Sequence, residues 1–354
     1  MIEIDGSVHS GSGTLLRHAV ALAALLGEAL HMTRIRAKRD KPGLRPQHVQ
    51  AVRACADFSR GEIEGAEVGS SEILFQPGRG ALTGGDYEWD IGTAGSTTML
   101  ASALVPAAVF AESRSSFTIT GGVFQDFAPS AFHQQKILVP LLNRMGAKIG
   151  IDIVRPGYPP KGQGKIRVTV EPAGQELKPL EMMRPGRAET IRGISLASHL
   201  KTEKVASRMA EESRNALGEK GYPVLCEVIE DRSAVQKGAA LLLWAETETG
   251  CLLGADQAGK PGRRSEKIAR FVAASLLEDL SSGAATDRHL ADQLIVYAAL
   301  AGGTTRYTIP RMTDHVESNL WLVYKILGAA SDVRENRISI RGVGFKRKKE
   351  EGGS

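Results

Sequence analysis

One supersecondary pattern occurs three times along the chain, and this repetition limits the possible folds more than any other feature. Each copy reads as a glycine-rich entry, an apolar helix, a strand, a loop, a second helix and two further strands. The copies cover residues 1–90, 91–182 and 284–343. A histidine lies near the start of the second helix of each copy, at His48, His133 and His315. The pattern predicts an α/β (α+β) fold in which three βαβαββ units form one large domain around a shared core.

Glycine and proline residues indicate where the helices begin and end. The helix expected over Thr14–Leu26 stops before a glycine, and the helix over Pro46–Ser59 has its proline in the first turn. A further helix is expected over Pro129–Met145, where Pro140 predicts a kink because it lacks a backbone N–H. Between the first two helices, His31–Ala37 is expected to be a strand.

Residues 183–283 interrupt the repeats, so the large domain consists of 1–182 and 284–343. The interrupting segment reads as four strands and two helices, with a Pro-Gly pair at its entry and a Ser-Ser-Gly stretch at its exit. Such a set can bury a core of its own, so we expect a smaller inserted α/β domain. Residues 344–354 form a basic tail.

The composition is that of an ordinary globular protein, with 42% hydrophobic and 24% charged residues. The net charge of +5 suits a nucleic-acid partner, although part of the excess comes from Lys346–Lys349, a run typical of a solvated end. The three cysteines lack metal-ligand spacing and indicate reduced thiols. Because the sequence shows no leader and no apolar stretch long enough to span a bilayer, we expect a cytoplasmic protein.

Near the C-terminus, a helix-start signal coincides with a histidine. Asp314 and Glu317 have the spacing of a capping box, so a helix is expected to begin at Asp314 and to end at Gly328. His315 would be its first helical residue, exposed among unpaired backbone N–H groups that favour an anion and disfavour an imidazolium. A neutral histidine in that place suits attack on a phosphorus atom. The alternative is a surface histidine that merely follows a cap.

Two groups of basic residues are candidates for phosphate binding. Arg17 lies in an otherwise apolar helix, and it either binds a phosphate or extends its guanidinium to solvent. Arg34, Arg36 and Lys38 alternate along the expected strand and would share one face, which suits a phosphodiester track or is simply a solvated face. Aromatic residues make up only 5% of the chain, which argues against extensive stacking on single-stranded bases.

The segment from His289 to Gln293 opens the first helix of the third copy with polar groups one turn apart. His289, Asp292 and Gln293 can contact a nucleotide; equally, Asp292 can serve only to complement the helix dipole. The sequence shows no serine–histidine–acid triad, no zincin motif and no cysteine cluster, so proteolysis and structural zinc are unsupported.

Several motifs occur in order along nearly the whole chain. They are Ile35-Arg36-Ala37 with Arg39, Pro42-Gly43-Leu44, Gln47-His48, Ile91-Gly92-Thr93-Ala94-Gly95-Ser96, Leu290-Ala291-Asp292-Gln293-Leu294, and His315 with Ser318-Asn319. Together they resemble the RNA 3′-terminal phosphate cyclase family, which also has an insertion at the corresponding place.

The resemblance implies an enzyme that uses ATP with Mg²⁺ or Mn²⁺ and acts on RNA with a 3′-phosphate end, with no membrane and no obligate protein partner. Family members convert this phosphate to a 2′,3′-cyclic phosphate through a histidine–AMP and an RNA-3′-pp-5′-A intermediate. His315 matches the nucleophile. The ATP-contacting segment is matched by His289, Leu290, Ala291, Asp292 and Gln293. Positions around the nucleotide and phosphate groups are matched by Arg17, Arg36, Arg39 and Gln47.

The chain departs from the family pattern at three places. Ser10 stands where the family has the glutamate associated with the metal, so the metal ligands stay unassigned. Ser102 occupies the position of a glutamine near the ATP, and we keep it among the candidate ATP-binding residues. Gly162-Gln163-Gly164 replaces three consecutive glycines.

Two other functions remain open beside the cyclase. A non-catalytic RNA-binding relative that acts in ribosomal RNA processing is favoured by the loss of the carboxylate at Ser10 and disfavoured by the retained His315. An enolpyruvyl transferase, built from similar βαβαββ units, would bind small phosphorylated acids and would not need His315; this alternative rests on fold analogy alone.

Overall fold

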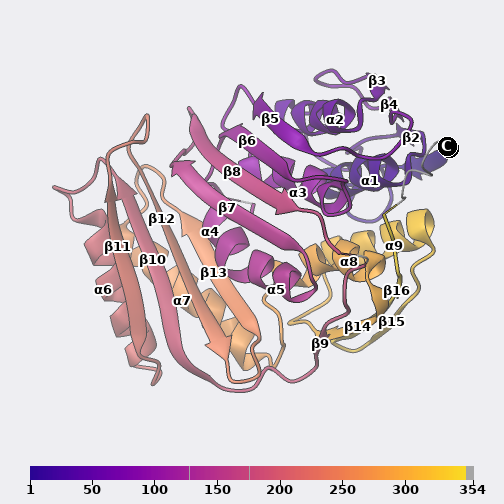
Figure 1. Cartoon of the computed structure of the whole chain (residues 1–354). Helices are drawn as coiled ribbons and strands as arrows, with labels where there is room; N and C mark the ends of the chain where they lie inside the picture. The colour runs from indigo at the N-terminus through magenta and orange to yellow at the C-terminus, as the bar shows by residue number, and fades with distance from the viewer. Residues whose placement is uncertain (127, 175, 348–354) are drawn as a thin grey trace.

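The computed structural model describes residues 1–126, 128–174 and 176–347, so residues 348–354 of the expected basic tail lie outside the described residues. Within the described part, the chain has a mixed α/β fold whose strands form four-stranded sheets (Figure 1). The first sheet, ordered β1-β2-β4-β3, consists of β1 (Ile2–Asp5), β2 (Leu30–Thr33), β3 (Glu62–Glu64) and β4 (Ile73–Gln76). The second, ordered β5-β6-β8-β7, consists of β5 (Gly85–Asp90), β6 (Ser115–Gly121), β7 (Lys148–Arg155) and β8 (Gly164–Glu171).

The third sheet repeats this arrangement. Ordered β9-β14-β16-β15, it consists of β9 (Glu181–Met182), β14 (Gly302–Thr308), β15 (Ser331–Arg334) and β16 (Arg337–Val343). In each of these three sheets, the first two strands are parallel and the remaining pairings are antiparallel. The three predicted βαβαββ units are therefore present as three sheets of one topology.

Each of the three sheets is accompanied by helices that pack toward the middle of the molecule. They are α1 (Gly13–Leu26) and α2 (Pro46–Ser59); α3 (Thr97–Ala108), α4 (Ala131–His133), the π-helix η1 (Gln134–Leu138) and α5 (Val139–Arg144); and α8 (Leu290–Leu300) and α9 (Asp314–Leu327). Helix α1 packs against α2, α3 and α9, and its Leu15, Leu16 and Leu22 are fully buried. Helices of different units thus share one apolar core, which brings their N-terminal ends close together.

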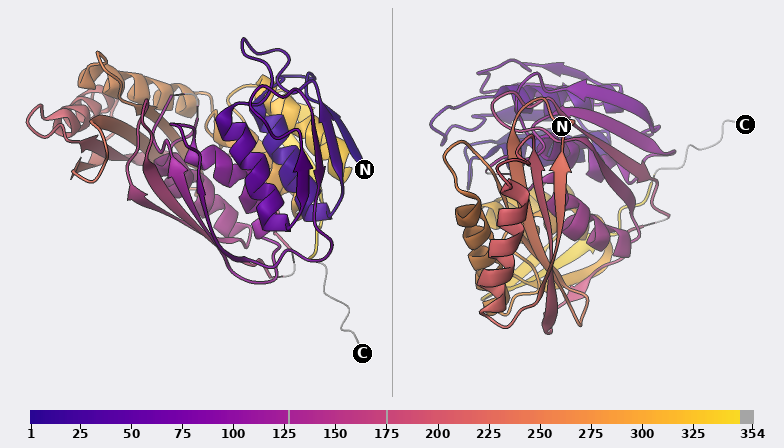
Figure 2. Two further views of the ribbon diagram at one scale, coloured as in Figure 1. Left: turned by 90° about the horizontal axis from the view of Figure 1, so that it is seen from above. Right: turned by 90° about the vertical axis from the view of Figure 1, so that its left-hand side faces the viewer.

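The segment expected as an insertion forms a sheet of its own, ordered β11-β10-β12-β13, with two helices. Its elements are β10 (Ala188–Ser198), α6 (Val205–Gly218), β11 (Val224–Asp231), β12 (Gly238–Thr247), β13 (Leu252–Ala258) and α7 (Ser265–Ser281). Figure 2 shows this part at one end of the molecule, with the N-terminus at the opposite end. Its strand β13 contacts α4 and η1, so the insertion rests on the second unit.

The second and third units begin earlier in the chain than the expected boundaries. Strand β5 precedes residue 91, and its alternating Tyr87 and Trp89 are a strand signal that the expected boundary overlooks. Strand β9 pairs in parallel with β14, so the third sheet starts before the insertion rather than at residue 284. A two-residue strand between prolines has no periodicity of its own, and only the distant partner β14 defines it.

The expected strand over His31–Ala37 is wrong in its second half, because β2 ends at Thr33. Arg34 and Arg36 have φ angles of 49° and 56°, so the chain turns there instead of continuing as a strand. The buried Ile35 is held by its backbone, which pairs with Ser71 and Gly43. Arg34, Arg36 and Lys38 therefore do not line one face of a strand.

Two helix predictions need correction. The helix expected over Pro129–Met145 is divided into α4, the π-helix η1 and α5; η1 ends two residues before Pro140, and Val139 N–H donates to the Gln134 carbonyl. Helix α9 ends at Gly328 as predicted, but its N-cap is Thr313, whose hydroxyl accepts from Val316 N–H. His315 is therefore the second helical residue, not the first.

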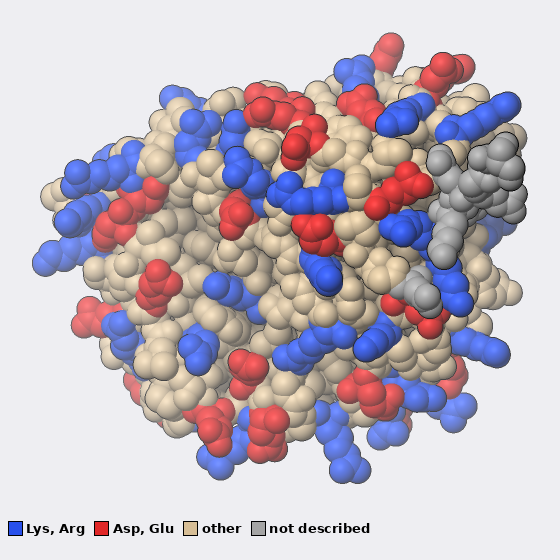
Figure 3. All heavy atoms as spheres, viewed as in Figure 1, with Lys and Arg blue, Asp and Glu red and all other residues tan. Residues whose placement is uncertain are grey.

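No helix in the described ranges is long and apolar enough to cross a membrane. On the face shown in Figure 3, lysine and arginine side chains are interspersed with acidic ones, so the net positive charge is not gathered into a single patch there.

Candidate active site

A cavity of about 690 Å³ lies where the N-terminal ends of helices from all three units meet. Of the residues singled out in the sequence, it is lined by Arg17, Arg36, Arg39, Gln47, His48, Ser102, His289, Asp292, Gln293 and His315. Leu290 and Ala291 are fully buried inside α8 and do not reach the cavity. The fold thus brings together side chains that are up to three hundred residues apart in the sequence.

His315 reaches the cavity from the first turn of α9, and its ring is half-buried rather than exposed as expected. Its Nδ1 is buried and has no hydrogen-bond partner. Burial lowers the pKa of His315, and the nearby cations Arg39 and Arg17 lower it further. Burial and the arginines thus act in the same direction as the positive field at the helix start, and the ring is neutral at neutral pH. A neutral ring keeps one nitrogen lone pair for nucleophilic attack.

Arg17 is a buried cation without a carboxylate partner in the described part of the chain. Only 6% of its surface is exposed, so it does not extend to solvent. One guanidinium nitrogen lies 3.4 Å from the Thr14 hydroxyl and 3.2 Å from the Met99 sulfur, while Nε has no partner. Burial and the nearby Arg36 lower the pKa of Arg17 to about 10, so it still carries its charge. A buried, unpaired cation that faces a cavity provides a binding position for an anion.

Two further arginines extend this positive end of the cavity. Arg36 donates from one guanidinium nitrogen to the carbonyls of Lys41 and Gly43, at 2.7 Å each, which fixes the side chain. Burial, Arg39 and Arg45 lower the pKa of Arg36, which indicates mutual repulsion among the cations. Such repulsion is relieved when a polyanion binds, so this end of the cavity suits a chain of phosphates.

His48 supplies a neutral donor to the same end. Its Nδ1 accepts a hydrogen bond from Arg45 N–H at 3.1 Å, so the proton of the neutral ring is on Nε2. Burial, followed by Arg17 and other cations, lowers the pKa of His48 to about 2. A Cβ added at Gly13 would lie only 2.2 Å from His48 Nε2, so the glycine-rich entry allows this close approach.

Gln47 is held by the loop before α3. Its Oε1 accepts from Ser96 N–H at 3.1 Å, which leaves the side-chain amino group available to the cavity. A Cβ added at Gly95 would lie 2.8 Å from the Gln47 Cβ, so this glycine also permits a close approach.

His18 lines the cavity but was not singled out in the sequence. Its Nδ1 lies 3.2 Å from the Asn319 Oδ1, and the Asn319 amino group donates to the Asp292 carbonyl at 3.1 Å. Asn319 can only accept from His18 in this arrangement, so Nδ1 carries the proton and Nε2 is left as an acceptor. Burial lowers the pKa of His18 to about 4. The available signal was a histidine beside Arg17 in an otherwise apolar helix.

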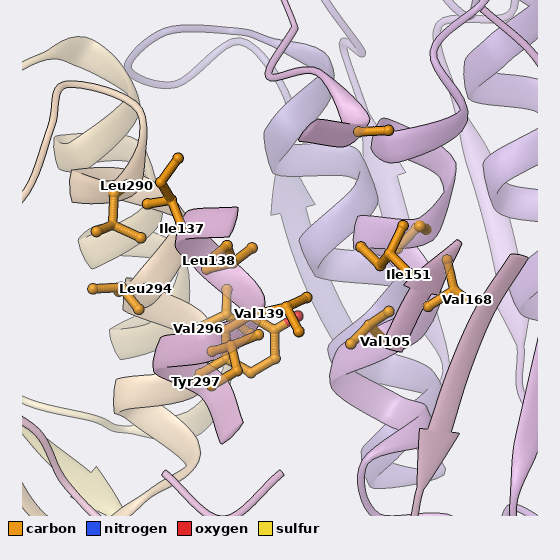
Figure 4. Packing of buried hydrophobic residues seen from close by; sticks show 14 of the residues in the cluster. Val105, Ile137, Leu138, Val139, Ile151, Val168, Leu290, Leu294, Val296 and Tyr297 are labelled. Carbon is orange, nitrogen blue, oxygen red and sulfur yellow. The ribbon is translucent and has the colours of Figure 1, made fainter. Parts of the chain in front are cut away.

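The rest of the cavity lining combines a few polar groups with an apolar wall. Burial, and then the nearby Asp287, raise the pKa of Asp292 to about 7. Gln293 accepts from Gln134 at 2.7 Å, and Ser102 donates to the Met99 carbonyl at 2.8 Å. The apolar wall is formed by Val105, Leu138, Val139, Leu142, Ile149, Ile151 and Tyr297. Figure 4 shows Val139 and Tyr297 on one side, and Val105 and Ile151 on the other. An apolar wall with few polar groups suits a nucleoside.

The residue at the expected metal position does not fit a resident divalent ion. Ser10 Oγ lies 3.0 Å from Ser12 Oγ and 2.8 Å from Ser318 Oγ, so neutral hydroxyls surround it. Across the described ranges, no three His, Cys, Asp or Glu side chains are grouped as metal ligands. The altered Gly162-Gln163-Gly164 loop lies outside the cavity lining, where Gly162 packs against the Thr93–Ala94 backbone.

Comparison with known proteins agrees with these motifs. The model of the RNA 3′-terminal phosphate cyclase family matches residues 8–333. This chain belongs to that family. The RNA 3′-terminal phosphate cyclase of Archaeoglobus fulgidus is 38% identical over 343 residues, which cover 96% of this chain and 100% of the relative. The protein of the same name from Pyrobaculum neutrophilum is 36% identical over 348 residues, covering 97% of this chain and 99% of the relative.

Among solved structures, the enolpyruvyl transferase NikO from Streptomyces tendae matches with a TM-score of 0.38 and 11% identity, covering 95% of this chain and 48% of that chain. This similarity is too low to support an argument about fold or function.

Proposed function

We propose that this protein converts the 3′-terminal phosphate of RNA to a 2′,3′-cyclic phosphate at the expense of ATP. The observation that carries the proposal is the juxtaposition of a neutral histidine, His315, with the buried and unpaired cation Arg17 in one cavity. The first supplies a nucleophile, and the second supplies charge for the phosphate that it attacks.

In the first step, the ring nitrogen of His315 that is not buried attacks the α-phosphorus of ATP, and pyrophosphate leaves. Arg17, Arg36 and Arg39 balance the charge that develops on the phosphate oxygens. The Nε2–H of His48 adds a neutral donor at the same end. At the other end, the apolar wall and the first turn of α8 hold the nucleoside, with Ser102 on the facing helix α3.

In the second step, the RNA 3′-phosphate takes AMP from His315 and forms the RNA-3′-pp-5′-A intermediate. The neighbouring 2′-hydroxyl then displaces AMP and closes the cyclic phosphate. Both transfers require two anions in one cavity, and the excess of arginines over carboxylates at its positive end supports this requirement.

Mg²⁺ or Mn²⁺ is proposed to arrive with the ATP phosphates and water, because Ser10 and its neighbours offer no anionic ligand. The three free cysteines, Cys55, Cys226 and Cys251, support a reducing compartment, and hence the cytoplasm, as the place of the reaction.

Incubation with magnesium and α-labelled ATP tests the proposal directly. The protein should acquire an acid-labile, alkali-stable label, as expected for a phosphoramidate, and should release pyrophosphate. His315→Ala should abolish the label. His31→Ala is the matched control because His31 lies on β2, outside the cavity, and it should label like the wild type.

Failure of the wild type to acquire label while it binds 3′-phosphorylated RNA would reject the cyclase activity. That result would favour the non-catalytic RNA-binding relative, for which the neutral surroundings of Ser10 are the supporting observation. Label that survives His315→Ala would place the nucleophile on another residue.

A further inference from the structure

Asp287, a carboxylate with no exposed surface, lies immediately before the first turn of α8 and accepts four hydrogen bonds. Its Oδ1 accepts from the backbone N–H groups of His289 and Leu290, both at 2.8 Å. Its Oδ2 accepts from the His133 Nε2 at 3.0 Å and from Gly254 N–H at 2.9 Å. One side chain thus joins three parts of the chain that are distant in sequence.

These donors come from three different parts of the fold. His133 lies on α4 of the second unit, Gly254 on β13 of the insertion, and the two backbone donors open α8 of the third unit. Strand β13 also holds α4 directly, because the Asp256 carboxylate accepts from Ser130 N–H at 2.9 Å. Ser130 in turn caps α4 by accepting from His133 N–H at 3.2 Å. The insertion therefore holds the starts of α4 and α8 together.

His133 and Asp287 form a fully buried ion pair. Burial opposes the charge on each of them, but the partner outweighs it: the pKa of His133 is raised, and that of Asp287 is lowered to about 2. The Nδ1 of His133 is buried without a hydrogen-bond partner. A buried pair with one unsatisfied N–H is an inefficient way to stabilise a fold, since an apolar pair of similar size does so at least as well. Its geometry suggests another role.

The helix turn that Asp287 fixes is the one that faces the nucleoside end of the cavity. Three side chains of this turn line the cavity: His289, Asp292 and Gln293. The His289 ring packs edge-on against the His133 ring, with the two ring centroids 5.9 Å apart. The backbone of His289 is one of the two groups that the Asp287 Oδ1 holds. A change in the direction of this carboxylate would therefore displace cavity-lining side chains together.

We propose that Asp287, aimed by His133 and by Gly254 of the insertion, is a positioning residue for the nucleotide. Through Asp287, the nucleoside site forms correctly only when the inserted domain is docked on the three-unit body. This inference rests on the proposed use of ATP, and it adds residues that do not touch the nucleotide themselves.

Asp287→Asn is the sharpest perturbation, because an amide has one oxygen where the carboxylate has two. Two of the four N–H groups around the side chain would then face an amino group instead of an acceptor. We expect the Kd for α,β-methylene-ATP, measured by calorimetry, to rise by about tenfold or more, the size that loss of a buried hydrogen bond to a charged group gives. This analogue cannot transfer AMP, so binding is measured apart from chemistry.

Tyr158→Phe is the matched control. The Tyr158 hydroxyl lies 2.8 Å from Ser198 Oγ, and both residues are buried where the second unit meets β10 of the insertion. This variant also removes a buried hydrogen bond between unit and insertion, but at a distance from α8. It should lower the melting temperature and leave the Kd for the analogue within about twofold of wild type.

Two substitutions at His133 separate hydrogen bonding from packing. His133→Gln keeps an N–H donor for Asp287, whereas His133→Phe keeps the ring shape and has no donor. If His133 acts by aiming the Asp287 carboxylate, His133→Gln should bind the ATP analogue more tightly than His133→Phe does. If His133 only fills space with its ring, His133→Phe should bind it more tightly.

The inference would be overturned by an unchanged Kd in a folded Asp287→Asn variant, or by tighter binding in His133→Phe than in His133→Gln. The proposed function would still stand in either case, provided that the wild type binds the analogue. If the wild type itself binds no ATP analogue, the proposed function fails, and the inference fails with it.

Discussion

Arg17 offers a substitution for which stability and activity should change in opposite directions. Its guanidinium is buried, has no carboxylate partner among the described residues, and has a pKa lowered from 12.5 to about 10. A cation with a lowered folded-state pKa destabilises the fold, because the charged form is disfavoured there. This free-energy cost of burying the charged guanidinium is fully present at neutral pH and disappears only as the pH rises from about 10 to 12.5. At about 1.4 kcal/mol per pKa unit, the buried charge costs on the order of 3 kcal/mol.

Arg17→Met removes this charge and keeps an unbranched apolar stem. The methionine cannot donate to the Thr14 hydroxyl at 3.4 Å or to the Met99 sulfur at 3.2 Å, and these long or weak hydrogen bonds together contribute roughly 1–2 kcal/mol. The net expectation is a gain of about 1–2 kcal/mol, or a rise in melting temperature of roughly 1–3 °C. Labelling by ATP should meanwhile be lost, because the phosphate loses its buried counter-charge.

Thermal and urea unfolding of the nucleotide-free proteins measure the first effect, and the labelling assay measures the second. Arg263→Met is the contrasting control, since Arg263 binds the Asp126 carboxylate with two hydrogen bonds of 2.9 and 2.8 Å. Its removal should destabilise the fold by about 1–3 kcal/mol. A lower melting temperature for Arg17→Met than for the wild type, or full labelling by that variant, would refute the assignment of Arg17 as a cation reserved for phosphate.

Three further variants test other parts of the molecule. Ser10→Glu should lower the magnesium concentration needed for half-maximal labelling; an unchanged requirement would place Ser10 away from the ion. Ser102→Gln should add a polar contact at the nucleoside end and lower the KM for ATP several-fold, and a higher KM would show that the base already fills the space beside Ser102. Glu72 and Glu3 raise the pKa of His31 above its ordinary value of 6.5. The stability that His31 contributes to the fold is therefore fully present below pH 6.5 and is lost as the pH rises through the raised pKa. Melting temperatures across this range should therefore fall more for wild type than for His31→Gln, and parallel curves would contradict the assignment.

Local signals in the sequence were sufficient for the glycine ends of two helices. Helices α1 and α9 end at Gly27 and Gly328, whose φ angles of 70° and 73° suit glycine. Positions that depend on a distant partner were missed. Strand β9 is defined only by β14, and the chain turns after Thr33 because Ile35 is drawn into the core. A pattern along one segment contains no information about such partners.

The same distinction applies to the candidate site. Arg17 was singled out because it is a charged residue in an apolar helix, and His315 because it follows a helix-start signal; the family motifs then supplied the remaining candidates. The structure added the reason for the lowered pKa of His315, which comes mainly from burial and from arginines that are almost three hundred residues away. It also added His18 and Asp287, whose roles depend on Asn319 and His133 and are therefore invisible in either segment alone.

Removal of the insertion tests whether the three-unit body folds on its own and whether the insertion positions α8 through Asp287. Replacement of Pro185–Ser282 by a flexible linker leaves the three like sheets intact, because β9 and β14 both lie outside the excised range. It deprives Asp287 of Gly254 N–H and uncovers the face of η1 on which Gly254 packs, where an added Cβ would lie 2.4 Å from Ile137. The truncated chain should therefore melt cooperatively, as circular dichroism can show, but at a lower temperature and with a Kd for the ATP analogue at least as weak as that of Asp287→Asn.

A further Asp287→Ala change in the truncated chain should lower its melting temperature less than the same change lowers that of the intact chain, because one of the four donors to the carboxylate is already lost with Gly254. The same change in the intact chain should lower the melting temperature, since there the carboxylate has all four of its donors. A smaller decrease in the truncated chain than in the intact chain would show that the insertion acts on α8 through Asp287. A truncated chain that binds the analogue as tightly as the intact protein would contradict that connection, and one recovered only as aggregate would contradict an independently folding three-unit body.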